Sequence, residues 1–326
     1  MLQAKIFERI VSLHHNQAEA LQKVSDLLFI NKSNAYRRLT NEIKLKPDQI
    51  STLVKHYNLS LDELIHNKEN QYLFVHSNQS VASDKIEVFF KPIFDQLEQV
   101  AKIPDYFIYF TGYEIPILHY SAYPELVYFK IFLWNHIKMR TDNKVMSFNL
   151  TSFDDKYRIL FKGIKDNFNK VRSVEVWDKR GIQIVVGYIK YAHNARLITF
   201  EETTLLISLL KKAIDDFEQK AMYGTKDLIN KPKNFELYHS EVINDSHMYI
   251  SNSKLIGQAN FINLLFDSPN QIVSYDTQIV DKMRERFLLL KNQSQKISET
   301  GEVARRKLFG HYRKEIRLLE RELKPF

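Results

Sequence analysis

The chain contains no cysteine and little glycine, and each shortage excludes a class of site. Without cysteine there is no disulfide scaffold, thiolate zinc site, iron–sulfur cluster or cysteine nucleophile. Glycine supplies only 8 of the 326 residues, against a usual share of about 7%. This scarcity counts against glycine loops that cradle nucleotide phosphates, and no Walker, GxGxxG or GxSxG motif occurs.

Catalytic and metal-binding patterns are also missing. No pair of histidines has the HxxxH or HExxH spacing that metal sites use. The adjacent acids Asp154–Asp155 and Asp215–Asp216 would not face each other on a helix, so they form no acid–base pair. We therefore expect no enzymatic activity, no catalytic residues, no bound metal and no cofactor.

Long apolar runs are absent as well. The most apolar stretch, Ile103 to Trp134, is interrupted by acidic residues and prolines, so it does not read as a membrane span. The first ten residues carry Lys5, Glu8 and Arg9 and lack the apolar core of a signal peptide. We expect a cytoplasmic protein without a membrane partner.

The composition that remains is that of a globular protein, with 44% hydrophobic and 26% charged residues. At about 150 residues per domain, the length suggests roughly two domains. The formal net charge of +8 permits a nucleic-acid partner without proving one. The pattern along the chain predicts a mainly α protein with an α+β C-terminal region.

Residues 1–70 predict a domain of five short helices. Asn16 with Glu19 three residues later marks one helix start, and Asn31 marks the start of a helix over 32–40. Pro47 suits the first turn of a fourth helix, and Ser60 with Glu63 forms a capping box before a fifth.

The rest of the chain predicts a linker over 71–83, a mixed α+β sensor domain over 84–274 and a helical hairpin over 275–326. Within the mixed region, the apolar patterns predict helices over 86–100, 125–139, 157–171 and 198–221. Short aromatic and β-branched runs predict strands over 106–110, 115–119, 173–177, 182–186, 236–238 and 248–250.

The hairpin is a candidate dimerisation element. Tyr312, Ile316, Leu319 and Leu323 follow one another at spacings of 4, 3 and 4, which is compatible with helix pairing. Packing of the same residues within the chain is the alternative. The segment 278–326 is also basic, with 13 Lys/Arg against 7 Asp/Glu.

The helix expected over 32–40 would present a polar and basic face. Small Ser25 and Ala35 allow two helices to approach closely, and Ile30 can fill the core beneath the turn between them. Between Asn31 and Lys46 there are five Lys/Arg and a single acid. Cations and hydrogen-bond donors in this position suit a helix that enters the DNA major groove. The residues left facing outward are Lys32, Ser33, Asn34, Tyr36, Arg37 and Arg38.

These residues resemble the lambda-repressor-like (XRE-type) helix-turn-helix family of bacterial transcriptional regulators, over about residues 2–66. The segment 28–32 (LFINK) stands where the family has a Leu-Gly-Val-Ser-Arg turn, and 58–64 (NLSLDEL) is similar to its closing segment. The resemblance implies binding of double-stranded DNA, with contacts to bases from Lys32, Ser33, Asn34 and Arg37. It also implies phosphate contacts from Gln22, Lys44 and Lys46.

Two residues depart from the family pattern. Phe29 replaces the turn glycine, so a left-handed conformation there would be costly. Arg38 occupies a position that is usually apolar or aromatic, and we expect its stem to pack while its head reaches a phosphate. A single helix reads only a few base pairs, so we expect a homodimer on two half-sites about 34–36 Å apart.

The aromatic segment from Tyr106 to Trp134 is open to two interpretations. It can form ordinary core, or it can wall a sensor pocket for a small-molecule effector. The polar handles of such a pocket would be Tyr113, His119, Tyr120 and Tyr123. The alternative functions are a ligand-binding module or a protein–protein adaptor in which the helical domain does not bind DNA.

Overall fold

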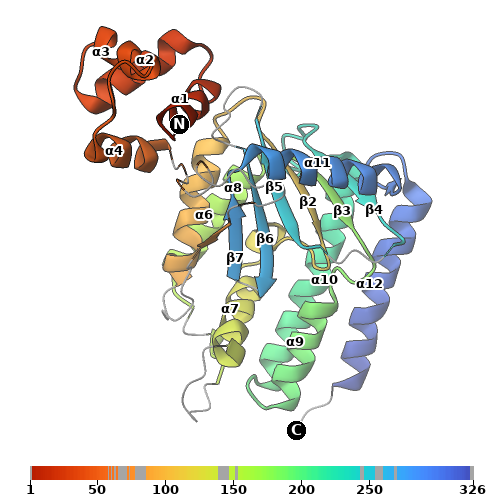
Figure 1. The fold of residues 1–326 in the computed structure, drawn as a ribbon. Coiled ribbons are helices and arrows are strands. Elements are labelled where there is room, and N and C mark those ends of the chain that lie inside the picture. Colours follow the sequence, from red (N-terminus) through yellow and green to blue (C-terminus); the bar gives the residue numbers. More distant parts are fainter. Residues whose placement is uncertain are drawn as a thin grey trace.

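The structure is a computed structural model in which a bundle of short helices precedes a mixed β-sheet that carries helices on both faces (Figure 1). It describes residues 2–57, 59, 61, 64, 72, 74–77, 86–138, 147–150, 153–242, 246–253, 260–267 and 270–323.

The N-terminal bundle forms as its capping residues predict. Asn16 Oδ1 accepts from the Glu19 amide at 2.9 Å, and Asn31 Oδ1 accepts from the Asn34 amide at 2.8 Å. The fifth helix expected around Ser60 lies largely outside the described residues. The bundle has its own core, built mainly from Ile6, Phe7, Ile10, Ala20, Val24, Ala35, Leu45, Leu53 and Tyr57. The helices are α1 (Leu2–Ser12), α2 (Gln17–Leu28), α3 (Lys32–Leu39) and α4 (Pro47–Tyr57).

The turn between α2 and α3 keeps the left-handed conformation although phenylalanine stands in it. Phe29 has φ 51° and ψ 45°, and its side chain is 96% exposed. The packing of the two helices therefore imposes the left-handed conformation, and phenylalanine does not favour it. The Phe29 side chain is almost unburied, so burial does not compensate for the strain.

Within the described residues, eight strands form one sheet in the order β1-β7-β6-β5-β2-β3-β4-β8. The central strands β2, β3 and β4 are parallel, and every other pairing is antiparallel. The strands are β1 (Val75–Ser77), β2 (Phe107–Gly112), β3 (Arg172–Trp177), β4 (Phe235–His239), β5 (Met248–Asn252), β6 (Phe261–Asp267), β7 (Asn270–Ser274) and β8 (Gln295–Lys296).

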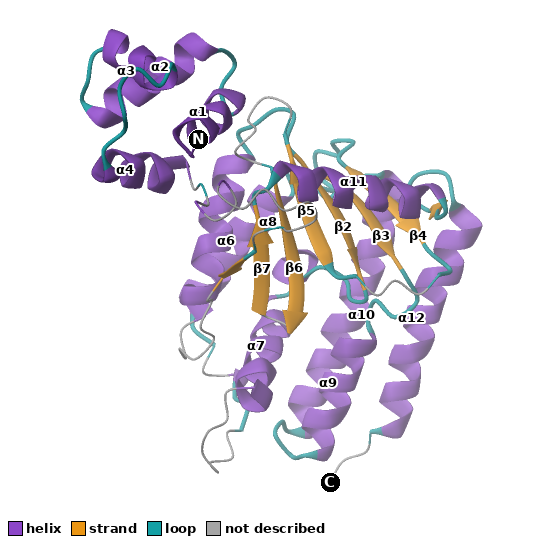
Figure 2. Ribbon diagram, viewed as in Figure 1, coloured by secondary structure: helices purple, strands orange, loops and turns teal. Residues whose placement is uncertain are grey.

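Alternation along the strands divides the buried side chains between two cores. On one face, Ile108 and Trp177 join the larger core with most of the helices. On the other face, Val174 and Val176 pack with α11, which crosses the strands in Figure 2. The helices of this region are α6 (Ile86–Val100), η1 (Ile117–Ala122), α7 (Pro124–Lys138), α8 (Asp155–Phe168), α9 (Gln183–Asn194), α10 (Phe200–Tyr223), α11 (Thr277–Asn292) and α12 (Glu302–Glu322).

Two predicted strands are wrong. Residues 115–119 enter the 3₁₀ helix η1, and residues 182–186 lead into α9. A short apolar run does not distinguish a strand from a buried helix segment, and here the burial of Val185, Ile189 and Ala192 follows the helical period. The predicted linker also needs correction, because its residues 75–77 form β1 and pair with β7.

The predicted C-terminal hairpin is wrong as well. Helices α11 and α12 form, but β8 separates them and they pack in different cores on opposite faces of the sheet. The seam from Tyr312 to Leu323 is buried within the chain, where α12 lies along α10. The alternative of intramolecular packing therefore holds, and the seam is not available for dimerisation.

Replacing Phe29 with glycine should stabilise the helical bundle by about 1 kcal/mol, because glycine adopts the left-handed conformation without strain. Native-state hydrogen exchange of the α2 and α3 amides measures the change. Asn41→Gly is the matched control: Asn41 also has a positive φ of 63°, but asparagine tolerates it, so the gain should be smaller. Faster exchange in Phe29→Gly would contradict this account.

Replacing Ile316 with alanine should lower the free energy of unfolding by about 2–5 kcal/mol, because it leaves a cavity between α12 and α10. Urea unfolding followed by the fluorescence of Trp134 and Trp177 measures this. Leu318→Ala on the same helix is the control; Leu318 is 42% exposed, so the change should stay within about 0.5 kcal/mol. A lower molecular mass in light scattering with unchanged unfolding would instead restore the seam as a dimer contact.

Candidate functional site

The contact between α2 and α3 rests on the small residues that the sequence indicated. Ser25 is buried and its hydroxyl donates to the carbonyl of Ile30, which packs at the edge of the bundle core. Ala35 is fully buried on the inner side of α3. This close approach fixes which side of α3 remains in solvent.

The outward side of α3 carries cations and hydrogen-bonding groups. Lys32, Ser33, Tyr36 and Arg37 are exposed, and Asn34 is half-buried. Arg37 Nε lies 3.2 Å from Glu42 Oε2, and both side chains are more than half exposed. A surface ion pair of this kind contributes little, so Arg37 can exchange Glu42 for another anion.

Arg38 does not belong to this face, and its predicted outward position is wrong. It is 8% exposed. Its Nη1 donates to the carbonyl of Asn34 at 3.1 Å, and its Nε donates to Gln49 Oε1 at 3.3 Å. The stem packs as expected, but the guanidinium joins α3 to α4 and does not reach toward solvent.

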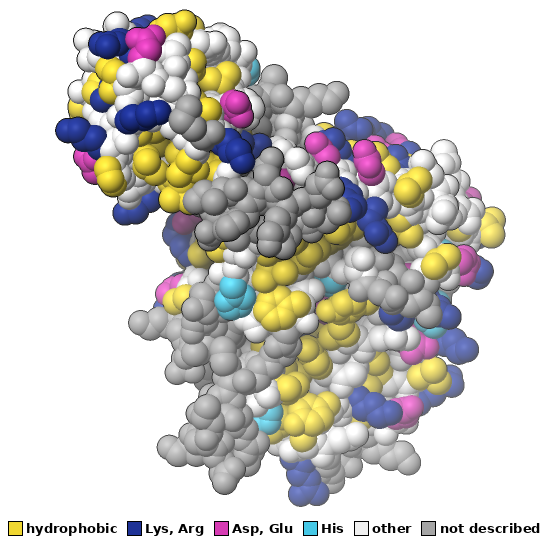
Figure 3. Space-filling model, viewed as in Figure 1, with side chains coloured by type: hydrophobic (Ala, Val, Ile, Leu, Met, Phe, Trp, Pro, Cys, Tyr) yellow, Lys and Arg dark blue, Asp and Glu magenta, His cyan; other side chains and the backbone are white. Residues whose placement is uncertain are grey.

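The three other residues expected to contact phosphates, Gln22, Lys44 and Lys46, are exposed. Lys44 and Lys46 lie between α3 and α4. Gln22 stands in the middle of α2 and not near its start, and its amide donates to Asp26 Oδ1 at 2.7 Å. Figure 3 shows Lys and Arg side chains spread over the N-terminal bundle.

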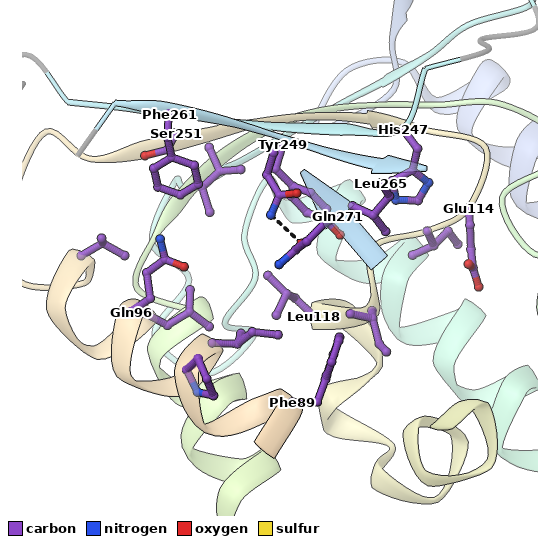
Figure 4. Close-up of a pocket in the computed structure, with 18 of the residues that line it drawn as sticks. Phe89, Gln96, Glu114, Leu118, His247, Tyr249, Ser251, Phe261, Leu265 and Gln271 are labelled. Carbon is purple, nitrogen blue, oxygen red and sulfur yellow. Dashed lines mark hydrogen bonds between the residues drawn. The ribbon is translucent and has the colours of Figure 1, made fainter. Parts of the chain in front are cut away.

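A cavity of about 160 Å³ lies in the sheet region, between one face of the sheet and α6, η1 and α7. Strands β2, β5, β6 and β7 form its roof in Figure 4, and Phe89 and Leu118 lie opposite. Its walls are mainly apolar, with contributions from Ile93, Leu97, Ile108, Ile115, Trp134, Phe261 and Leu265.

None of the four residues predicted as pocket handles lines this cavity. His119 and Tyr120 are buried in the larger core, and the Tyr123 hydroxyl donates to the Lys212 carbonyl at 3.1 Å. Tyr113 packs its ring against His247, with centroids 4.8 Å apart. Other residues of the same segment line the cavity instead, among them Glu114, Ile115, Ile117 and Leu118.

His119 belongs to a buried network around Glu175. Glu175 accepts from Ser173 at 2.8 Å, from Trp177 Nε1 at 2.9 Å and from His119 Nε2 at 3.0 Å. Burial alone would raise the pKa of Glu175, but His119 and the hydrogen bonds lower it overall, so the carboxylate is ionised. This network satisfies a charge in the core and does not line the cavity, so we assign it a structural role.

The cavity contains a buried ion pair. Lys130 is 1% exposed and donates to the carboxylate of Glu114, which is 5% exposed. The Lys130 ammonium also lies 5.6 Å from the ring centroids of Tyr120 and Trp134. The two charges cancel, so the site as a whole is neutral.

Further polar groups stand along the sheet side of the cavity. Asn263 Nδ2 donates to Gln271 Oε1 at 2.6 Å, the bond drawn in Figure 4. Ser251 Oγ donates to the hydroxyl of Tyr106 at 2.7 Å. His247 is buried, and desolvation followed by the charge of Lys130 lowers its pKa from 6.5 to about 4, so it is neutral at pH 7.

Sequence reasoning missed most of these polar residues. Strands β6 and β7 were not predicted, so Asn263 and Gln271 had no assigned place. The available signal was Lys130, a cation inside the apolar and aromatic run 126–134, because a lysine in such a run must be paired when it is buried.

The described ranges bring no three histidine, aspartate or glutamate side chains together as a metal site. They also contain no helix with both the length and the apolar character that crossing a membrane requires. No protein-family model, curated protein or solved structure matches the chain.

Folding stability should fall in acid through His247. Its pKa is lower in the folded chain than in the unfolded chain, so its contribution is complete above pH 6.5 and is lost as the pH falls toward 4. Between pH 7 and pH 5 the wild type should lose about 2 kcal/mol more than His247→Phe, as urea unfolding at both pH values measures. His15→Gln, at an exposed histidine, should lose as much as the wild type; an equal loss in His247→Phe would contradict the assignment.

Proposed function

We propose that the protein is a sequence-specific DNA-binding transcriptional regulator whose helix α3 enters the major groove. The observation that carries the proposal is the outward face of α3, where exposed Lys32, Ser33 and Arg37 stand opposite buried Ala35. The same helix is held by a tight contact through Ser25, so its exposed face is presented rigidly.

The side chains divide into two roles. Lys32, Arg37, Lys44 and Lys46 neutralise phosphates and release counterions, which supplies affinity. Ser33, Asn34 and Arg37 donate or accept hydrogen bonds at base edges, which supplies specificity. Tyr36 and Gln22 flank this surface from α3 and α2, whereas Arg38 has no part in it because its guanidinium is buried.

We further propose that a homodimer carries two copies of α3 to half-sites about 34–36 Å apart. One short helix covers few base pairs, so two copies are needed for a specific site. Because the α12 seam is used within the chain, the dimer would form through another surface.

A second candidate function is the binding of a small effector by the sheet region. The cavity beneath β5, β6 and β7 favours it, since a concave, mainly apolar space with a few buried polar groups is the usual form of a ligand site. An effector bound there would act on the same chain that carries α3.

The double variant Lys32→Ala and Arg37→Ala should weaken binding to duplex DNA and flatten its salt dependence. Each lost phosphate contact lowers the slope of log Kd against log salt by about 0.9, so the slope should fall by nearly two. Fluorescence anisotropy with labelled DNA at four salt concentrations measures it. The matched control is Lys162→Ala on α8, a cation 75% exposed and outside the helical bundle, which should bind as the wild type does.

An unchanged slope in the double variant would exclude α3 as the DNA-contacting helix. Failure of the wild type to bind any duplex at low salt would exclude the proposed function and favour the adaptor alternative.

A further inference from the structure

The cavity beneath β5, β6 and β7 has a polar pattern that restricts what it can hold. Asn263 is oriented by its bond to Gln271, which uses the amide nitrogen. Its Oδ1 is buried and has no hydrogen-bond partner among the described residues. An amide oxygen is an acceptor only, so this atom requires a donor.

The carboxylate of Glu114 also lines the cavity and adds acceptor capacity. Glu114 receives a hydrogen bond from Lys130 and, as a carboxylate, has no hydrogen to donate. Lys130 supplies that bond and otherwise lies near the rings of Tyr120 and Trp134. Lys130 keeps further N–H donors, and the unpartnered buried atoms at the cavity are Asn263 Oδ1, which only accepts, and His247 Nδ1, which accepts or donates according to its tautomer.

We propose that this cavity binds an uncharged aromatic molecule of one or two fused rings that carries an N–H or O–H donor. The inference rests on the second candidate function, effector binding by the sheet region, and names the class of effector. It does not depend on whether α3 binds DNA.

Size limits the ligand to a compact molecule. The volume of about 160 Å³ is close to that of an engineered cavity of about 150 Å³ which binds benzene. The aromatic rings of Phe89, Trp134, Tyr249 and Phe261 line the space and suit a planar apolar body.

Charge excludes ionic ligands. Lys130 is already neutralised by Glu114, and His247 is neutral at pH 7. A charged ligand would enter a buried site without a free counter-charge, and that desolvation would be uncompensated.

The test uses the full-length protein and a matched pair of probes, indole and benzofuran, in isothermal titration calorimetry at pH 7.5. The two molecules have nearly the same size and shape, but only indole has an N–H donor. Indole should bind at least about tenfold more tightly, because benzofuran leaves the buried acceptor unpaired. Benzoate, a charged single ring, should not bind.

Two variants locate the effect. Asn263→Leu removes the acceptor, so the ratio between indole and benzofuran should fall to about one while benzofuran still binds. Leu265→Trp fills the cavity from β6 and should abolish binding of both probes. Circular dichroism and unfolding curves show whether each variant is folded. If a variant does not fold, the ratio of the indole and benzofuran affinities in the wild type still tests the donor requirement.

The outcomes distinguish binding of an aromatic ligand at the cavity from the requirement for a hydrogen-bond donor on that ligand. Equal affinities in the wild type would overturn the donor requirement but retain ligand binding. No heat with either probe would overturn the ligand class and leave the cavity without support as an effector site. Binding that survives Leu265→Trp would place the probes elsewhere and overturn the site.

Discussion

Burial of the central strands on both faces is the constraint on which the rest of the sheet region depends. Along β3, Val174 and Val176 enter one core while Ser173, Glu175 and Trp177 enter the other. Neither face can remain in water, so helices must cover both. This requirement sends α11 and α12 to opposite sides and buries the seam of α12 against α10. It also brings a carboxylate into the core, where Glu175 is stable only because three neighbours donate hydrogen bonds to it.

The two candidate sites follow opposite physical rules. The DNA contact proposed for α3 requires exposed cations and a rigid helix behind them. The ligand binding proposed for the cavity depends on buried polar groups, because an unpaired acceptor or an uncompensated charge is costly there. The first site is therefore suited to a large polyanion and the second to a small neutral molecule. Arg38 follows Arg37 directly in the chain, but it is buried and forms its hydrogen bonds within the bundle. Two adjacent arginines therefore have different roles because they differ in burial.

Local signals predicted the N-terminal helices well because their information lies within a few residues. Asn16 and Asn31 cap the helices that follow them, and Pro47 begins α4, as their positions indicated. The run Ile182–Val186 failed because a helix buried on a sheet is as apolar as a strand. The pocket handles failed for a related reason: the pattern identified an aromatic segment, but which side chains face a cavity depends on β6 and β7, which lie far along the chain.

The sequence by itself determined the helical bundle, the exposed basic residues of α3 and the exclusion of cysteine chemistry, since each depends on residue type and short-range spacing. Only the tertiary structure decided that α11 and α12 part across a sheet, that Arg38 turns inward and that Lys130, Glu114, His247 and Asn263 meet at one cavity. These features arise from contacts between distant segments. Periodicity shows that a side chain is to be buried, but the partner that buries it is set by the fold of the whole chain.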